Sequence, residues 1–342
     1  MRIVLLGGAG YVGCVLARHL ADAGHELCVI DLFQFLQPSS LATVAHVKTV
    51  DTRQLTADDF AGADAIVDLA AISNDPSGEL DVEITREINT YARIRAAEAA
   101  REAGVDRYVL LSSCSVYGAC DAVVDETSPL NPLTAYAASN AQAELGVLAL
   151  AAPNFSVTAL RLATVFGLSP SMRFDLVVNT MTLSAFSSGS ITVNGGGDQF
   201  RPLIHVRDVA AAVERTLLAP PEAVGGGIFN ISSRNMGMRE VAAAVVAGLE
   251  RSIQLNVLEE TADKRNYRVD SSKMRRVLGL RADRSVGMAA ATIMEALASG
   301  RLAPSPFSIR LNGYRTFVEA QRATASEPFP TDRVNAAEPT VF

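Results

Sequence analysis

The first 31 residues contain glycines and a carboxylate at a spacing that suits anion binding. Gly7, Gly10 and Gly13 follow an apolar run at residues 3–6 and open a helical pattern. Glycines placed in this way permit a tight turn, a close approach of backbone to a pyrophosphate and close packing of helix on strand, while the helix N-terminus attracts the anion. Asp31 ends the next apolar run, 18 residues beyond Gly13, near the roughly 20 expected of a carboxylate that binds the adenosine ribose. The pattern predicts a dinucleotide-binding site.

Asp31 favours NAD over NADP as the cofactor. Its carboxylate would repel a ribose 2′-phosphate, and the next residues, Leu32, Phe33, Gln34 and Phe35, include no Arg that would bind one. Other residues expected at the cofactor lie in the glycine loop or follow predicted strands. They are Tyr11, Val12, Leu32, Asp51, Thr52, Leu69, Ala70 and Ala71.

Alternating strand and helix patterns must position these residues. Strand patterns occupy residues 46–50, 65–70 and 107–112, with helical patterns near 56–60 and from about 81 to 103. Repeated units of this kind build a parallel sheet covered by helices, and ligands collect at the carboxyl ends of its strands. We therefore predict an α/β fold with a doubly wound parallel Rossmann sheet.

The pattern becomes less regular after a helix at residues 134–150 and a strand at 156–161. We predict an NAD-binding Rossmann domain over residues 1–165, with later segments interleaved, and a smaller α/β substrate lobe over 166–322. The elements expected in the lobe are a helix at 174–188, a glycine turn at 195–197, strands at 203–206 and 227–231, and helices at 239–249 and 286–298. Residues 323–342 lack periodicity and are expected to form a mobile tail.

Composition excludes several classes of function. The chain has 342 residues, of which 49% are hydrophobic and 20% charged, and its net charge is −7. A nucleic-acid surface needs clustered Lys and Arg, which are absent. No apolar stretch reaches the ~20 residues of a membrane span, and the strand pattern directly after Met1 leaves no room for a secretory leader. Because the four cysteines lack zinc-ligand spacing, we expect no metal. Without a leader or a membrane span, we expect a cytoplasmic protein.

Several ordered motifs resemble one enzyme family. Residues 112–118 read SSCSVYG and residues 136–140 read YAASN. Together they resemble the extended short-chain dehydrogenase/reductases, specifically the nucleotide-sugar epimerases and dehydratases. Further matching segments lie at residues 161–167, 199–209 and 267–270, so the resemblance covers roughly residues 1–315.

The resemblance implies roles for residues at the reacting centre. Tyr136 would take the proton of a sugar hydroxyl while NAD takes the hydride, and Ser113 would hydrogen-bond the same oxygen. Asp51 would bind the adenine edge. The family has a Lys four residues after the Tyr, which holds the nicotinamide ribose and lowers the Tyr pKa, whereas this chain has Asn140. An amide can donate to a ribose hydroxyl but carries no charge, so a Tyr with an ordinary pKa of about 10 would stay mostly protonated.

The residues after Ser113 narrow the reaction. Family dehydratases place an Asp-Glu pair there, but this chain has Cys114 and Ser115, which disfavours 4,6-dehydration. Cys114 is either a proton donor or acceptor or a small buried thiol. Epimerisation through C4 oxidation and reduction of a nucleotide-activated hexose is our first hypothesis. Keto-sugar reduction, in which a neutral Tyr136 donates the proton, is the second, and a low-turnover NAD and nucleotide-sugar binding protein is the alternative from another class.

Substrate recognition is expected to use guanidinium groups, which bind a pyrophosphate in a bidentate manner. Arg201 and Arg268 match diphosphate-binding positions of the family, whereas Arg173 is either a contact or a solvated surface charge. The residues expected on the substrate side are Ser73, Ser115, Arg173, Asn179, Arg201 and Arg268. His205 is expected to make a structural hydrogen bond beside Asp208. The resemblance also implies a homodimer formed through the helices at 81–103 and 134–150.

Overall fold

A computed structural model describes residues 1–249, 251–259 and 266–324. Its centre is a seven-stranded sheet in the order β3-β2-β1-β4-β5-β7-β11, with all neighbouring strands parallel. The strands are β1 Arg2–Leu6, β2 Glu26–Asp31, β3 His46–Thr49, β4 Ala65–Asp68, β5 Arg107–Ser113, β7 Ser156–Leu162 and β11 Gly227–Ile231. The chain order reverses beside β1, which creates the crevice typical of doubly wound sheets. The predicted fold class is confirmed.

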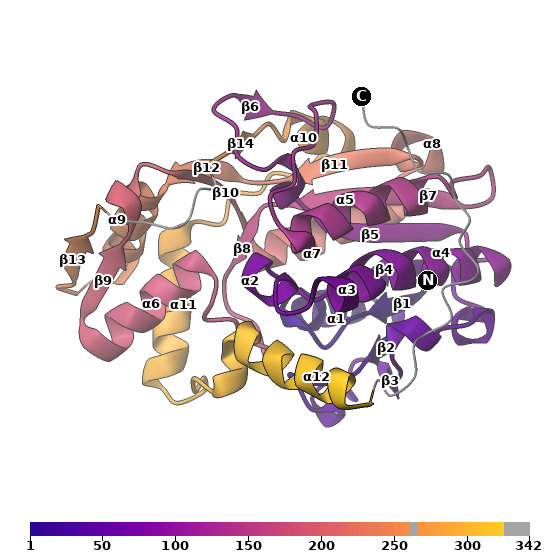
Figure 1. Ribbon diagram of the computed structural model, residues 1–342, viewed down its shortest axis with the longest axis horizontal. Coiled ribbons are helices and arrows are strands. Elements are labelled where there is room, and N and C mark those ends of the chain that lie inside the picture. The colour runs from indigo at the N-terminus through magenta and orange to yellow at the C-terminus, as the bar shows by residue number, and fades with distance from the viewer. Residues whose placement is uncertain (250, 260–265, 325–342) are drawn as a thin grey trace.

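Helices cover both faces of this sheet (Figure 1). They include α1 Tyr11–Asp22, α4 Arg93–Glu102, α5 Ala135–Leu148 and α7 Val206–Leu218. Alternate residues of β1 pack in opposite directions, with Ile3 and Leu5 in the core beneath α1 and α7, and Val4 and Leu6 in the core beneath α4 and α5. Burial on both faces explains the continuous apolar runs that identify these strands in the sequence.

The helix expected at residues 81–103 contains an irregular turn. Asp81 caps α3 Val82–Arg86, a π-helical turn, η4 Glu87–Ala92, follows, and α4 then begins at Arg93. Asn89 in this turn is fully buried, and its amide exchanges hydrogen bonds of 2.8 and 3.0 Å with the backbone of Ile72. The turn therefore ties the helix to the loop after β4 and sets where Arg93 enters the core.

A second lobe contains α6 Val177–Ser188, α9 Met238–Leu249 and α11 Val286–Ala298. Its short sheets have the strand orders β12-β10-β8 and β13-β9, and β14 pairs with β6 in a further two-stranded sheet. Their bounds are β6 Val123–Val124, β8 Thr164–Phe166, β9 Ser190–Val193, β10 Phe200–His205, β12 Arg234–Gly237, β13 Gln254–Val257 and β14 Arg268–Val269. The short helices are α2 Asp75–Gly78, α8 Pro221–Val224 and α10 Ser272–Leu278. The division into two domains stays a prediction. The strand at residues 227–231 was expected in the lobe, which is wrong, because β11 pairs with β7 and completes the main sheet.

Some elements differ from the sequence prediction. The segment near residues 56–60 is a 3-10 helix, η3 Ala57–Phe60, and the helix expected to start at 174 begins at Val177. Helix α7 was not predicted, nor was α12 Arg310–Thr324, which runs from the second lobe toward β2 and β3 (Figure 1). Helix α12 includes two residues of the expected tail, and the rest of that tail lies outside the described residues. No helix in the described ranges has the length and apolarity to cross a membrane.

Candidate active site

A cavity of about 630 Å³ opens at the carboxyl ends of the central strands, between the main sheet, the second lobe and α12. Most residues predicted from the sequence line it. These are Gly7, Gly10, Tyr11, Val12, Gly13, Asp31, Leu32, Asp51, Thr52, Leu69, Ala70, Ala71, Ser73, Ser113, Ser115, Tyr136, Asn140, Arg173 and Arg201. Cys114, Asn179 and Arg268 are not among the lining residues.

The glycine loop forms a cradle whose backbone packs too closely for side chains at Gly7 and Gly13. Gly7 has a φ of +74°, and a Cβ there would lie 2.8 Å from the Ala70 backbone. A Cβ on Gly13 would lie 2.6 Å from the Cα of Gly8. Gly10 precedes α1 without a side-chain cap, so the first N–H groups of the helix remain for an anion. The cradle fits the pyrophosphate of a dinucleotide.

Asp31 joins the end of β2 to this loop. Its Oδ2 accepts a hydrogen bond from Ala9 N at 2.9 Å, and its Oδ1 accepts one from Phe33 N at 2.9 Å. Burial raises the pKa of Asp31, although these backbone hydrogen bonds oppose the rise. Since carboxylate oxygens accept more than one hydrogen bond, Asp31 retains acceptor capacity for a ribose.

Asp51 is held by its own neighbour. The carboxylate caps η2 Thr52–Gln54 and accepts hydrogen bonds from Arg53 N at 2.9 Å, Nε at 3.0 Å and Nη2 at 2.5 Å. Burial raises the pKa of Asp51, but the hydrogen bonds and charge of Arg53 outweigh it and lower the pKa. Any contact of Asp51 with an adenine edge would share a carboxylate that is already ion-paired.

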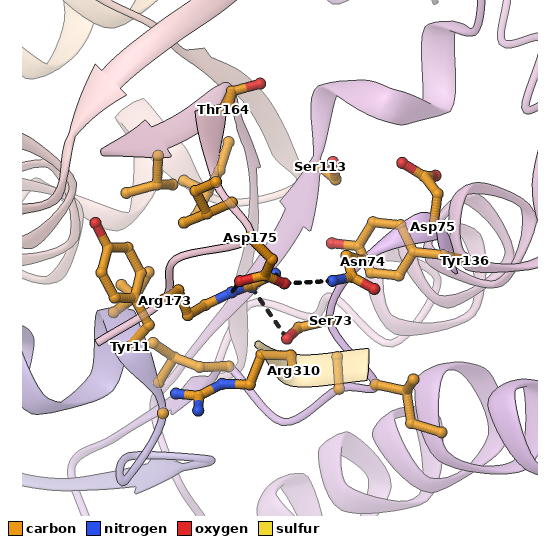
Figure 2. Close-up of a pocket in the computed structure, with 18 of the residues that line it drawn as sticks. Tyr11, Ser73, Asn74, Asp75, Ser113, Tyr136, Thr164, Arg173, Asp175 and Arg310 are labelled. Carbon is orange, nitrogen blue, oxygen red and sulfur yellow. Dashed lines mark hydrogen bonds and ion pairs between the residues drawn. The ribbon is translucent and has the colours of Figure 1, made fainter. Parts of the chain in front are cut away.

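Tyr136 lies at the start of α5, opposite the glycine loop. Figure 2 shows it beside Asp75, with Ser113 on the same side of the pocket and Tyr11 on the other. Thr134 caps α5 and donates a hydrogen bond to Asp75 Oδ1 at 2.6 Å. Burial of the hydroxyl raises the pKa of Tyr136, and Asp75 adds to the rise, whereas Ser113 and the charges of Arg173 and Arg93 oppose it. The phenol is therefore protonated at neutral pH.

Asn140 lies one turn after Tyr136 and contacts a buried cation. Its Nδ2 donates to the Tyr136 carbonyl at 2.9 Å, and its Oδ1 accepts from Arg93 Nη1 at 3.1 Å. Arg93 also donates to Asp68 Oδ2 at 2.9 Å and to the Leu111 carbonyl at 2.7 Å. The side chains of Arg93 and Asp68 are each only 1% exposed, so this ion pair lies in the core under the reacting end of the cavity.

The side chains of Ser113, Cys114 and Ser115, at and just after the end of β5, have different surroundings. Ser113 Oγ accepts a hydrogen bond from Ser115 N at 3.1 Å. The buried Ser115 Oγ has no hydrogen-bond partner among the described residues, which suits a group that binds a ligand in the cavity. Cys114 is fully buried, and its Sγ donates to the Arg161 carbonyl at 3.3 Å. Burial raises the pKa of its thiol well above the ordinary range, and the structure does not bring Cys114 to the cavity.

Arg173 is buried in an ion-paired cluster, so its interpretation as a solvated surface charge is wrong. Its Nη2 lies 2.8 Å from Asp175 Oδ2, and its Nη1 donates to Ser73 Oγ at 3.2 Å. Asn74 Nδ2 also donates to Asp175, at 2.6 Å. Figure 2 shows this cluster in the middle of the pocket. Arg173 thus presents a guanidinium whose position is fixed by the second lobe and by the loop after β4.

Asn179 supports the site from behind. It is fully buried, and its Nδ2 donates to Tyr11 Oη at 3.1 Å and to the Arg173 carbonyl at 2.9 Å. Its Oδ1 accepts from Gly167 N at 3.1 Å. These bonds join α6 to the glycine loop. Asn179 therefore positions Tyr11 and Arg173 and does not reach the cavity.

Arg201 and Arg268 are placed differently. Arg201 is buried, lines the cavity and lies over the Tyr267 ring, with its Cζ 6.0 Å from the ring centroid. Arg268 donates to the Asp121 carbonyl and lies over the Phe200 ring at 5.1 Å, away from the lining. The structure therefore brings only Arg201 of this pair to the cavity.

His205 is a structural residue, as expected, but its partner differs. It caps α7, and its Nδ1 accepts from Arg207 N at 3.1 Å. Its ring packs edge-on against Phe166, with centroids 5.4 Å apart. Burial and the charges of Arg284 and Arg207 lower its pKa to about 4. Asp208 instead binds Arg284.

The cavity residues that were not identified from the sequence include Asn74, Asp75, Asp175, Arg310 and Tyr314. The first two directly follow Ser73, which was expected on the substrate side, and Asp175 lies two residues after Arg173. Their closeness in the sequence to predicted site residues is the signal that marks them. Arg310 and Tyr314 belong to α12, whose approach to the cavity is a tertiary feature with no local signal.

The doubly wound sheet, the glycine cradle at its crevice and the adjacent Tyr and Ser define a Rossmann-type enzyme fold. The family described as NAD dependent epimerase/dehydratase matches residues 3–232. The chain belongs to this family, within the extended short-chain dehydrogenase/reductases.

Relatives cover most of the chain. Low-salt glycan biosynthesis protein Agl12 of Haloferax volcanii is 27% identical over 289 residues, which are 80% of this chain and 91% of that protein. UDP-glucose 4-epimerase of Corynebacterium glutamicum is 28% identical over 252 residues, which are 68% of this chain and 75% of that protein. The structure of MoeE5 in complex with UDP-glucuronic acid and NAD superposes with a TM-score of 0.77 at 26% identity, covering 88% of this chain and 100% of MoeE5.

Proposed function

We propose that this protein is an NAD-dependent enzyme of the epimerase type, which oxidises and then reduces C4 of a nucleotide-activated hexose. The observation that carries the proposal is a single cavity that runs from the glycine cradle to Tyr136 and Ser113. The similarity to UDP-glucose 4-epimerase and to a structure that binds UDP-glucuronic acid and NAD supports the same class of substrate.

The residues of the cradle fit the proposed cofactor. Gly7 and Gly13 allow the close backbone packing that shapes the loop, Gly10 leaves the start of α1 without a side chain, and Asp31 lies where it would accept hydrogen bonds from the adenosine ribose. Bound NAD would supply a hydride acceptor at the sugar carbon. Asn140 would offer its amide N–H to the nicotinamide ribose, because its oxygen faces Arg93.

Tyr136 would hold and move the proton of the sugar C4 hydroxyl, with Ser113 hydrogen-bonded to the same oxygen. Asn140 stands at the position of the lysine that, in the family, lowers the pKa of the tyrosine base. The nearest buried cations are Arg93, which is paired with Asp68, and Arg173, which is paired with Asp175. Paired cations stabilise a phenolate less than a free lysine would, so we expect proton removal by Tyr136 to be slow at neutral pH.

Substrate would be held from the opposite wall. Arg201 lines the cavity and suits the diphosphate, whereas Arg173 and Ser115 are nearer the reacting end and suit sugar hydroxyls or a sugar carboxylate. Arg268 and Asn179 would act indirectly, by supporting this wall. The expected homodimer remains a proposal, for which the 71% exposure of Leu145 on α5 is the supporting observation.

Keto-sugar reduction is the second candidate, and the raised pKa of Tyr136 favours it. A neutral phenol is the form that donates a proton to a carbonyl being reduced, so no depression of the pKa is needed. The cysteine in the core argues against a second acid–base pair, and so against 4,6-dehydration, in both schemes.

Mass spectrometry with chromatography tests the proposal. The purified protein is incubated in D₂O with NAD or NADH and with UDP-, dTDP- and GDP-hexoses, including 4-keto sugars. An isobaric product that separates by chromatography, with no deuterium on carbon and no net change in NADH, is the expected result. Stoichiometric oxidation of NADH would establish the reductase, and loss of water would establish dehydration. No conversion by a protein that binds NAD would indicate the binding protein.

A further inference from the structure

Helix α12 crosses the loops that line the cofactor end of the cavity. The Gly313 carbonyl accepts from Gln34 Nε2 at 2.7 Å, and Tyr314 Oη donates to the Ala71 carbonyl at 2.9 Å. The Phe35 and Tyr314 rings pack edge-on with centroids 5.1 Å apart. Since these partners follow β2 and β4, α12 bridges the two strands that flank β1 on the crevice side.

Arg310, the first residue of α12, carries a buried charge into this region. It is 3% exposed and lines the cavity. Its hydrogen-bond partners among the described residues are neutral, namely the Phe307 carbonyl at 2.7 Å and the carbonyl and hydroxyl of Ser171 at 3.0 and 2.6 Å. Within the described ranges it forms no ion pair with a carboxylate. A buried guanidinium ordinarily has an anionic partner.

Hydrogen bonds connect Arg310 to the anion-binding end of α1. Ser171, which accepts from Arg310, donates its N–H to Ser169 Oγ at 3.3 Å, and Ser169 donates to the Tyr11 carbonyl at 2.7 Å. Tyr11 is the first residue of α1. In Figure 2 the guanidinium of Arg310 extends toward the side of the pocket that holds Tyr11, away from Tyr136 and Ser113.

Two carboxylates act on Arg310 only at longer range. Asp31 is engaged by backbone N–H groups and Asp175 by Arg173. Burial and the neighbouring charge of Arg173 lower the pKa of Arg310 to about 10, so the guanidinium remains charged at neutral pH. A guanidinium without a paired carboxylate among the described residues therefore lines the cavity on the side of the glycine cradle.

We propose that Arg310 is a ligand of the cofactor pyrophosphate and that α12 is a strap over the bound dinucleotide. This inference rests on the proposed function, because it assumes that a dinucleotide occupies the cradle. Its phosphates would supply the anionic partner that Arg310 lacks, from the side opposite the α1 N-terminus. Because α12 bridges the loops over this region, the cofactor would leave only when the strap lifts. Retention of the cofactor between half-reactions suits a redox-neutral reaction.

Calorimetric titration of nucleotide-free protein with NAD, ADP-ribose, adenosine and UDP tests the assignment. Arg310→Met removes the charge at similar side-chain length, and Arg310→Lys keeps it. Arg315→Met is the matched control, since Arg315 is exposed on the same helix. We expect Arg310→Met to lower the affinity for NAD and for ADP-ribose about 10- to 100-fold, as for loss of a charge-assisted hydrogen bond. The affinity for adenosine should be unchanged. Arg310→Lys should weaken both less.

The possible results separate this inference from the proposed function. If the wild-type protein does not bind NAD, both the proposed function and this inference are overturned. If it binds NAD and Arg310→Met binds ADP-ribose equally well, or loses affinity for UDP instead, the pyrophosphate assignment is overturned. Hydrogen exchange of the wild-type protein applies even if Arg310→Met does not fold. We expect ADP-ribose, but not adenosine, to protect the amides of α12, and equal exchange with both ligands would overturn the strap.

Discussion

Arg93 donates a hydrogen bond to the Oδ1 of Asn140 at 3.1 Å, and both side chains are buried. A guanidinium has donors only, so the oxygen of the amide must face Arg93. The amide nitrogen then faces the Tyr136 carbonyl, to which it donates at 2.9 Å. A substitution at position 140 therefore acts on a buried cation as well as on the cavity.

Because of this contact, we predict that Asn140→Lys will not raise the turnover of the enzyme. The new ammonium would replace an acceptor of Arg93 and place two like charges together in the core. We expect the free energy of unfolding to fall by about 2 to 4 kcal/mol, the order found when a buried charge lacks its partner, with no gain in turnover. Urea denaturation and the C4 epimerisation assay measure the two effects.

The double variant Asn140→Lys with Arg93→Met is the control. It removes the repulsion and leaves Asp68 as a partner for the lysine, so both stability and turnover should exceed those of Asn140→Lys. A large gain in turnover from the single variant at unchanged stability would show that Arg93 does not restrict this position.

Tyr136→Phe should lower turnover by about 10² to 10⁴, the usual contribution of a general acid or base. Its affinity for NAD should stay within about twofold, because the glycine cradle lies on the opposite side of the cavity. Tyr91→Phe is the matched control, since Tyr91 is 39% exposed on η4. Equal turnover of Tyr136→Phe and wild type would remove Tyr136 from the mechanism.

The pH dependence of sugar oxidation should follow the raised pKa of Tyr136. Because burial and Asp75 favour the neutral phenol, the fraction of phenolate increases as pH rises, so the oxidative rate should climb through neutral pH toward the alkaline range. Asp75→Asn removes a negative charge and keeps an acceptor for Thr134, which should shift the rising limb to lower pH. The measurement is the pH profile of kcat with saturating NAD. An unshifted profile would mean that Asp75 does not act on the base.

Alanine substitutions at the adjacent residues Cys114 and Ser115 should affect different properties, namely stability and substrate binding. Cys114→Ala should cost about 1 kcal/mol of stability through lost packing and leave turnover nearly unchanged, because the thiol is directed to the Arg161 carbonyl. Ser115→Ala should raise the KM for the sugar nucleotide by about 3- to 10-fold, as for loss of one hydrogen bond. Thermal unfolding and steady-state kinetics distinguish these effects. Loss of turnover in Cys114→Ala would revive the thiol as an acid or base.

The sequence allowed the Rossmann sheet to be predicted because its signals are local. Apolar runs mark strands that are buried on both faces, and Gly7, Gly10 and Gly13 mark the turn that the cradle requires. Most of the candidate site follows from these elements, since parallel strands end at the same edge. What Arg93 contacts could not be predicted in this way, because a π-helical turn and a long-range approach to α5 set it. The same holds for α12, whose contacts join residues about 240 to 280 positions apart.

The far end of α12 supplies a test of the strap that leaves the cavity intact. Arg322 Nη2 lies 2.7 Å from Asp81 Oδ2 and also donates to the Leu80 carbonyl at 3.2 Å, which fastens the helix to the start of α3. Arg322→Gln should loosen this end without touching the cofactor. Because exposed ion pairs contribute little, we expect NAD to dissociate only about 2- to 5-fold faster, as measured by stopped-flow displacement of a fluorescent NAD analogue. NAD should dissociate from the control variant Arg315→Gln at the wild-type rate. If NAD also leaves Arg322→Gln and Asp81→Asn at the wild-type rate, cofactor release does not require this end of the helix to lift.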